Sequence, residues 1–322
     1  MAHKIYLAPV RGCTDDVFRT LFARHFSGID RAVAPFFATR GGSIKETHLR
    51  QLLPENNASM PVVPQIMTNS PDDFRRFAHL LHGLGYDSVN VNMGCPHRRI
   101  TGRGLGAGLL ACPERIAAVL DAAAAVPLKI SVKMRLGLDD PEDIFGILPV
   151  LNRYPLSEII IHPRTAAQMY AGEPDRDVFR RCLSRSAHPV VYNGDICSLE
   201  GFNSLAALFP QAAGWMMGRG VLADPFLPGR IKGTAPHNDS VGRIRTFHDE
   251  LFDRYGALLS GPTHIVDKMR ELWVYLSRWF EEGPGLMRTL RKVRRAGEYR
   301  QAVNAFFERG PRRSKQTAGW SG

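Results

Sequence analysis

The sequence of 322 residues predicts an α/β protein, a (β/α)₈ barrel of the TIM type followed by a small all-helical C-terminal domain. Eight short, β-rich and nearly continuous apolar runs alternate with helical patterns over the first three quarters of the chain. Such runs are typical of a parallel sheet that is covered on both faces. After about residue 240 the pattern contains helices only. An open doubly wound sheet is disfavoured, because no Gly-x-Gly-x-x-Gly turn follows the first strand.

The elements of the barrel follow from these runs and from the residues that begin each helix. The expected strands cover residues 4–9, 31–37, 61–67, 88–94, 128–135, 158–164, 189–193 and 214–218. Helices are expected at 14–26, 71–84, 113–125, 141–153, 176–186 and 198–209, where Pro, Asp, Ser or Thr stands near each start. After the second strand, Gly41-Gly42 and Pro54 leave room for only a short helix.

The last quarter of the chain shows amphipathic helical patterns. Residues 243–259 and 264–282 place apolar side chains three and four apart, and 285–307 carries a dense basic face. The segment 232–240 has the composition of a linker. We therefore expect a catalytic barrel over 1–235, a helical domain over 241–309 and a disordered basic tail over 310–322.

Composition and cysteine usage indicate a soluble protein of a reducing compartment, and we expect it in the cytoplasm. No secretory signal pattern is expected at the N-terminus, and the most apolar later stretch is interrupted by Asp121, Pro127 and Lys129. The five cysteines are an odd number without Cys-x-x-Cys spacing, which disfavours a disulfide framework or a zinc site. Three of them are expected to be packing residues: Cys112, Cys182 and Cys197.

The formal charge of +11 is unevenly distributed. Residues 241–322 hold 16 Lys and Arg against 9 Asp and Glu, whereas 26 basic residues face 22 acidic ones in the remainder. This asymmetry indicates a polyanionic partner, and a solvated basic face is the alternative.

Functional side chains gather where the expected strands end, which is the working face of such a barrel. In chain order they are Pro9 and Val10, Gln65, Asn92 and Cys95, Lys133 and Arg135, His162 and Arg164, Asn193, Gly194 and Asp195, and Gly218 and Arg219. Lys133 and Arg135 lie two apart on one strand, so their side chains share a face. Both are expected in the barrel mouth, opposite an anion, and the alternative is that both extend to solvent.

The turns "YNGDI" and "MGRG" follow the seventh and eighth strands, where such barrels bind phosphate. Glycine permits close backbone approach there, and Arg219 can add a charged fork. A phosphate at this place with Lys133 across the mouth fits a flavin mononucleotide (FMN).

Cys95, in "NMGCPH", has three possible roles. As a thiol of ordinary pKa it can donate a proton; as a nucleophile it would need His97 as base; and it can also be a plain packing residue. No companions at metal-ligand spacing accompany it, and no metal site is expected.

These segments resemble the flavin-dependent tRNA dihydrouridine synthase family. The resemblance covers most of residues 4–230 and includes "LAPVRGCTD", "VNMGCPHRRITGRGLGAGLL", "SVKMRLG", "IHPRTAAQMYAGEPD", "YNGDI" and "MMGRG" in the family's order. A helical C-terminal domain also fits. The family usually has Met at Val10, Gly at Pro163 and Lys at Arg98.

The resemblance implies reduction of the C5=C6 bond of a uridine in tRNA, with NADPH as reductant. Hydride would pass from flavin N5 to C6 and a proton from Cys95 to C5. Residues implied to hold FMN are Pro9, Val10, Arg11, Gln65, Lys133, His162, Asn193, Gly194, Asp195, Gly218 and Arg219. Those implied near the RNA or uracil are Asn92, Arg135, Arg98, Arg99 and Arg164. The helical domain would bind tRNA, and the enzyme is expected to be a monomer without membrane contact or a protein partner.

Two other functions are consistent with parts of this pattern. One is a flavin oxidoreductase of a free pyrimidine, similar to dihydroorotate dehydrogenase, which the basic C-terminal region disfavours. The other is an RNA-binding homologue without turnover, which intact Cys95 and Lys133 disfavour.

Overall fold

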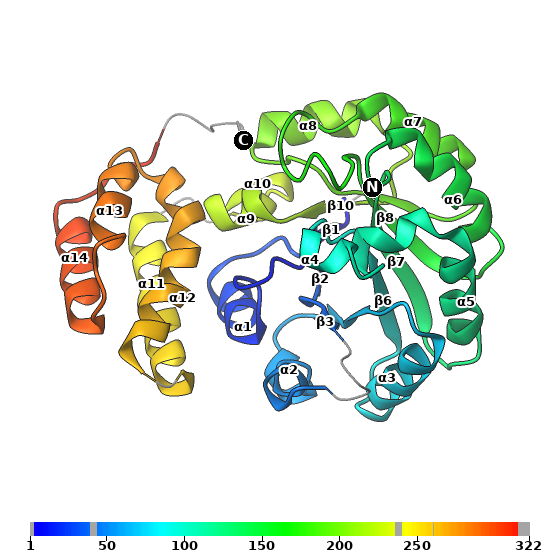
Figure 1. Ribbon diagram of the computed structural model, residues 1–322. Helices are drawn as coiled ribbons and strands as arrows, with labels where there is room; N and C mark the ends of the chain where they lie inside the picture. Colours follow the sequence, from blue (N-terminus) through cyan, green and yellow to red (C-terminus); the bar gives the residue numbers. More distant parts are fainter. Residues whose placement is uncertain (1–2, 39–43, 236–239, 260, 315–322) are drawn as a thin grey trace.

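A parallel sheet curls into a barrel in the computed structural model, which describes residues 3–38, 44–235, 240–259 and 261–314 (Figure 1). Its strands are β1 (Ile5–Leu7), β2 (Arg31–Val33), β3 (Phe37–Ala38), β4 (Val62–Val63), β5 (Gln65–Met67), β6 (Ser88–Met93), β7 (Lys129–Arg135), β8 (Leu156–His162), β9 (Val190–Tyr192) and β10 (Gly214–Met217). Their order in the sheet is β3-β5-β6-β7-β8-β9-β10-β1-β2-β4, and all their pairings are parallel.

The barrel closes through a strand that Pro64 divides in two. β4 pairs with β2, whereas β5, one residue further on, pairs with β6 and β3. Proline has no N–H for the ladder, but its carbonyl still accepts a 2.8 Å hydrogen bond from Asn90 N. The eight expected runs are therefore confirmed as strand positions of the barrel, with 31–37 and 61–67 each forming two short strands.

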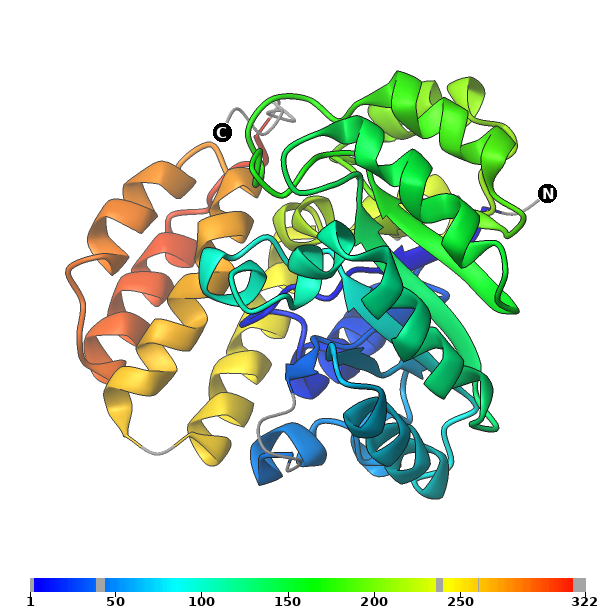
Figure 2. The same ribbon diagram turned by 45° about the vertical axis from the view of Figure 1, so that its right-hand side comes forward.

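Most of the helices that follow the strands cover the outside of the barrel, and short ones also lie at its mouth (Figure 2). They are α1 (Asp16–His25), α2 (Glu46–Arg50), α3 (Pro71–Gly83), α4 (Arg98–Thr101), α5 (Pro113–Ala124), α6 (Ile144–Leu151), α7 (Arg176–Arg185), α8 (Leu199–Leu208), α9 (Arg219–Ala223) and α10 (Leu227–Ile231). The capping residues act as the sequence predicts: Asp15, Ser70, Asp175 and Ser198 accept backbone hydrogen bonds at the starts of α1, α3, α7 and α8.

Side chains separate into two apolar layers, as strand parity requires. The outer layer lies between strands and helices and includes Ile130, Val132 and Met134 of β7. The inner layer fills the barrel: Tyr6, Ala8, Val33, Val63, Ile160, Val191 and Met216. At the end where the strands begin, Glu158 pairs with Arg31 and accepts a 3.1 Å hydrogen bond from Tyr6 Oη.

The C-terminal helices are α11 (Ser240–Leu258), α12 (Pro262–Leu276), α13 (Gly283–Leu290) and α14 (Ala296–Glu308). α11 packs on α1, where Phe247 contacts Phe18 and Tyr255 Oη donates a 2.8 Å hydrogen bond to Asp15. Arg313 forms an antiparallel bridge with Phe280. The first residues of the expected tail, 310–314, thus make backbone contacts with the helical region instead of being disordered. Residues 236–239 of the expected linker and 315–322 of the expected tail lie outside the described residues, so the disorder of 315–322 stays a prediction. No helix among the described residues is long and apolar enough to cross a membrane.

Candidate active site

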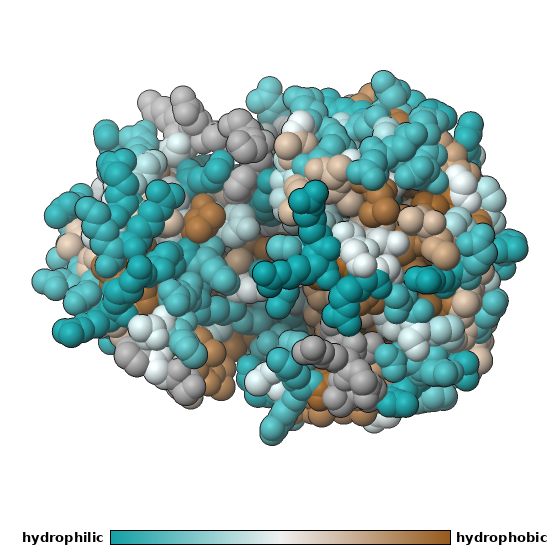
Figure 3. Space-filling view, in the orientation of Figure 1, coloured by the Kyte–Doolittle hydropathy of each residue, from teal (hydrophilic) through white to brown (hydrophobic). Residues whose placement is uncertain are grey.

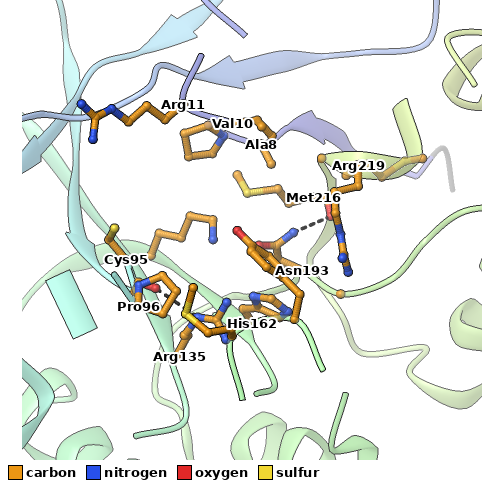
Figure 4. A pocket seen from close by; sticks show the side chains of 18 of the residues that line it. Ala8, Val10, Arg11, Cys95, Pro96, Arg135, His162, Asn193, Met216 and Arg219 are labelled. Atoms are coloured by element: carbon orange, nitrogen blue, oxygen red, sulfur yellow. Dashed lines mark hydrogen bonds between the residues drawn. The ribbon is translucent and has the colours of Figure 1, made fainter. Parts of the chain in front are cut away.

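A cavity of about 630 Å³ opens at the carboxyl ends of the barrel strands. Figure 4 shows Cys95, Pro96 and Arg135 on one side of it, Arg219 on the other, and Val10 and Arg11 along a third wall. Most of the expected site residues line it: Pro9, Val10, Arg11, Asn92, Cys95, Lys133, Arg135, His162, Asn193, Gly194, Asp195, Gly218 and Arg219. The side chains at the strand ends therefore surround one continuous cavity.

Four expected residues do not line this cavity. Gln65 and Arg164 are completely buried behind its wall, and Arg98 and Arg99 are exposed on α4 outside it. Arg164 turns away because the chain bends at Pro163, where Arg164 N donates a 2.8 Å hydrogen bond to His162 O. A bond between residues two apart is a γ-turn, which ends the alternation of the strand.

Lys133 and Arg135 both point into the cavity from β7, as their parity predicts. Burial, together with the nearby charge of Arg135, lowers the pKa of Lys133 from 10.5 to about 7. Burial also lowers the pKa of Arg135 to about 10. Among the described residues, no carboxylate lies within ion-pair distance of either cation. The cavity is therefore suited to an anionic ligand.

A chain of buried amides positions the loop of Cys95. Asn92 Oδ1 accepts hydrogen bonds from Gly94 N at 3.1 Å and from Cys95 N at 3.0 Å. Asn92 Nδ2 donates to Gln65 Oε1 at 2.8 Å, and Gln65 Nε2 donates to Asn90 Oδ1 at 2.7 Å. Gln65 thus acts on the cavity through Asn92, which explains a strand-end amide that does not itself line the space.

Two further contacts fix the same loop. Arg135 Nε donates to Gly94 O at 3.1 Å. Gly106, at φ +57°, packs so closely that an added Cβ would lie 2.7 Å from Cys95 O. The backbone around Cys95 is therefore held from the strand side and from the following loop.

Burial raises the pKa of the Cys95 thiol, opposed by the backbone N–H of His97 and by the charges of Arg11, Arg135 and Lys133. The thiol is thus protonated at neutral pH and can act as an acid. Within the described part of the chain, the imidazole of His97 makes no hydrogen bond to it. This geometry favours a proton donor over a nucleophile.

Asp195 joins two arginines at the far end of the cavity. Its carboxylate accepts from Arg164 at 3.1 and 2.5 Å and from Arg219 Nη2 at 2.5 Å. Burial favours the neutral acid, but the hydrogen bonds and charges of both arginines keep the pKa of Asp195 below its usual value. Arg164 also donates to the carbonyls of Ala171 and Gly172, at 3.2 and 2.5 Å, and so anchors the loop after β8.

That loop places Tyr170 at the mouth of the cavity. Its ring lies 4.6 Å from the guanidinium carbon of Arg219 and 5.4 Å from that of Arg135. His162 lies beneath, with its pKa held well below 6.5 by burial and by the surrounding cations. Arg164 Nη1 is 3.2 Å from His162 Nε2, and since a guanidinium only donates, the imidazole proton lies on Nδ1.

The sequence did not identify the cavity residues that come from outside the strand ends. Glu271 and Tyr275 of α12 line the wall, and so do Met169 and Tyr170 of the loop after β8. Phe36, near the end of the run expected as the second strand, also lines it and was not singled out. The spacing of Glu271 and Tyr275 places them on one face of a helix, which is the one available signal. Only the packing of α12 against the barrel assigns that face to the cavity.

The barrel with this cavity defines the class of the protein, a TIM-barrel enzyme with its site at the strand ends. Its sequence matches the family described as dihydrouridine synthase (Dus) over residues 6–309. The chain belongs to that family and is an oxidoreductase of the dihydrouridine synthase type.

Curated relatives match most of the chain. A protein of Cupriavidus necator named tRNA-dihydrouridine(16) synthase is 26% identical over 320 residues, which cover 94% of this chain and 97% of the relative. Its namesake in Salmonella typhimurium is 28% identical over 94% of this chain and 99% of its own length. Among solved structures, the old yellow enzyme homologue of Zymomonas mobilis has a TM-score of 0.56 at 13% identity, covering 76% of this chain and 92% of that one. At that identity the likeness shows the fold alone.

Proposed function

We propose that this protein reduces the C5=C6 bond of a uridine in tRNA, with FMN as bound cofactor and NADPH as reductant. The observation that carries the proposal is the cavity in which a protonated Cys95 thiol faces the same space as Lys133 and Arg135. Membership of the dihydrouridine synthase family supports it, as do the names of its relatives.

The residues of the cavity fit FMN. Its volume of about 630 Å³ lies within the range of about 300–1,000 Å³ that is typical of cofactor pockets. Lys133 lacks a carboxylate partner among the described residues, and its lowered pKa shows that the ligand-free cavity favours loss of its charge. An anionic ring edge would reverse that preference. Gly194, Gly218 and Arg219 lie at the ends of β9 and β10, the strands where phosphate binds in many such barrels.

When bound, the reduced flavin supplies the hydride for C6 of the uracil. Cys95 donates its thiol proton to C5, and the hydrogen bonds of Asn92 hold the loop from which it does so. Arg135 stabilises negative charge that develops on the pyrimidine carbonyl. His162 stays neutral and offers Nδ1–H as a donor. These roles divide proton transfer, charge stabilisation and ligand orientation among different side chains.

Exposed arginines extend from the cavity onto the surface and support RNA as the substrate. Arg98, Arg99 and Arg103 are exposed just after Cys95. A second exposed group lies between α13 and α14, and Figure 3 shows hydrophilic side chains over these helices on the left of the molecule. That group consists of Arg291, Lys292, Arg294 and Arg295. Contacts with phosphates at both places would hold the RNA while the target base leaves its stack.

We further propose uridine 16 as the target. The relatives named for that position are matched from the barrel through the C-terminal helices, over 94%, 92% and 94% of this chain. A relative named tRNA-dihydrouridine synthase B is matched over 75%. The helices and the barrel together would orient the tRNA and so determine which uridine reaches the cavity. A match over both parts therefore supports the same target as in those relatives.

The test combines RNA analysis with a cysteine variant. Mass spectrometry of tRNA from cells with and without the gene should show a gain of two daltons at uridine 16. Purified protein should be yellow, and Cys95→Ala should keep the colour while losing uridine reduction. Cys112→Ala, which changes a cysteine outside the cavity, is the matched control. Reduction of free pyrimidines with no change in tRNA would contradict the proposal.

A further inference from the structure

A second, smaller hollow of about 190 Å³ opens beside the catalytic cavity. The two spaces share the wall formed by Arg11, Gly12 and Phe36. Beyond that wall the second hollow is bounded by His48 and the chain after α2 on one side and by Lys268 of α12 on the other. A ligand that leaves the catalytic cavity across Arg11 therefore enters this hollow directly.

The walls of the second hollow combine an aromatic face with basic and neutral polar groups. Phe36 is half-buried and presents part of its ring, while Phe37 is buried behind it. Arg11 is exposed, and no carboxylate of the described residues lies within ion-pair distance of it. Burial lowers the pKa of His48, and the charges of Lys45 and Arg11 lower it further. His48 is thus a neutral ring at pH 7, able to donate and accept one hydrogen bond each.

The carboxylate that lines the hollow, that of Asp15, is already paired with a cation. Asp15 Oδ2 accepts a 2.6 Å hydrogen bond from Lys268, and Oδ1 accepts from Tyr255 Oη at 2.8 Å and from Phe18 N at 3.0 Å. Lys268 also donates to Gly12 O at 2.5 Å, which fixes α12 to the shared wall. Among the residues that line the hollow, Arg11 therefore remains as the exposed positive charge. The carboxylate of Glu271 lies on the side of the catalytic cavity, where it packs on Gly12.

We propose that this hollow binds the base of the nucleotide next to the target uridine, with the phosphate that links the two nucleosides on Arg11. The inference rests on the function proposed above. An aromatic face, a cation and a neutral hydrogen-bonding ring are the groups that recognise unstacked RNA bases. Arg11 lies in the shared wall, where the linking phosphate must pass if two successive nucleosides occupy the two spaces. A volume of about 190 Å³ is too small for a dinucleotide cofactor.

The experiment uses the full-length, flavin-loaded protein and tRNA transcripts with one abasic nucleotide on the 5′ or the 3′ side of the target. Stacking on an aromatic ring predicts that one of these replacements weakens tRNA binding by about 5- to 100-fold. In Phe36→Ala the same replacement should have little further effect, because the ring that it contacts is gone. Phe145→Ala, which removes a ring on the outer helix α6, should keep the full sensitivity to the abasic nucleotide.

The outcomes separate this inference from the proposed function. If the wild-type protein leaves intact tRNA unreduced, the proposed function fails. If it reduces tRNA but neither abasic position weakens binding, or if the effects of Phe36→Ala and the abasic position simply multiply, the hollow does not bind the neighbouring base. If Phe36→Ala raises the KM for NADPH and leaves the KM for tRNA unchanged, the hollow does not bind the neighbouring base. The abasic transcripts test the wild-type protein itself, so the result does not depend on how well the variant folds.

Discussion

The buried ammonium of Lys133 lowers the free energy of unfolding of the ligand-free protein, and the pH dependence of unfolding measures this effect. Its pKa falls from 10.5 to about 7 on folding, chiefly through burial. At about 1.36 kcal/mol per pKa unit, the ammonium costs about 4 kcal/mol of folding free energy at pH 7, before relaxation of the site reduces this value. Because the folded pKa is the lower one, the unfolded chain binds more protons between pH 7 and 10.5. The stability of the ligand-free protein therefore rises with pH across this window.

The substitution Lys133→Met removes this dependence. Urea unfolding of flavin-free protein should show the variant to be more stable at pH 7, with an advantage that shrinks by about 3 kcal/mol towards pH 9.5. Lys129→Met, at the exposed start of the same strand, is the control and should show no such trend. Parallel pH profiles for Lys133→Met and the wild type would refute the reasoning. Lys133→Met should bind flavin more weakly than the wild type, although it is the more stable protein without flavin, because it lacks the cation that faces the ligand.

Two further substitutions test how the site is held in place. Gly106→Ala adds a Cβ 2.7 Å from Cys95 O at a positive φ, so it should abolish most uridine reduction while the protein stays yellow. Gly297→Ala, where nothing lies within 4 Å, should be silent, and equal activity of both variants would contradict the close-packing argument. Asp195→Asn leaves the buried Arg164 without its carboxylate and should cost about 3–5 kcal/mol in urea unfolding. A loss below about 1 kcal/mol would show that the pair does not stabilise the fold.

Strand parity and strand ends made much of the cavity predictable. The apolar residues of β7 pack outward, so Lys133 and Arg135 had to face the barrel mouth. The alternation of side chains ends with β8 at His162, so it does not determine where the side chain of Arg164 lies. The γ-turn at Pro163 redirects its side chain towards Asp195 and the carbonyls of the following loop. A local turn of this kind depends on one dihedral angle, which the apolar pattern of the strand does not record.

The contribution of α12 required the tertiary structure for a different reason. Its amphipathic pattern correctly predicts a helix with a buried face. The opposite face carries Lys268, Glu271 and Tyr275, and the pattern of this helix alone would predict that these side chains lie in solvent. Lys268 instead bonds to Asp15 and Gly12 in the loop after β1, and Glu271 packs on Gly12. Which helix covers the mouth of a barrel depends on how the C-terminal helices pack against the barrel. The spacing of apolar residues within one helix does not contain this information.

The amide chain behind Cys95 shows how a strand-end residue can serve chemistry without touching the cavity. The backbone donors of Gly94 and Cys95 require Asn92 to present its oxygen to them, so its nitrogen must donate to Gln65. Gln65 must then donate to Asn90, which donates to Ser131 Oγ at 2.9 Å. Each orientation fixes the next, and buried amides with satisfied partners tolerate no reversal. The loop that carries the thiol therefore sets the donor and acceptor direction of every hydrogen bond in this series of amides. The loop is in turn held by four side chains on β5, β6 and β7, which are Gln65, Asn90, Asn92 and Ser131.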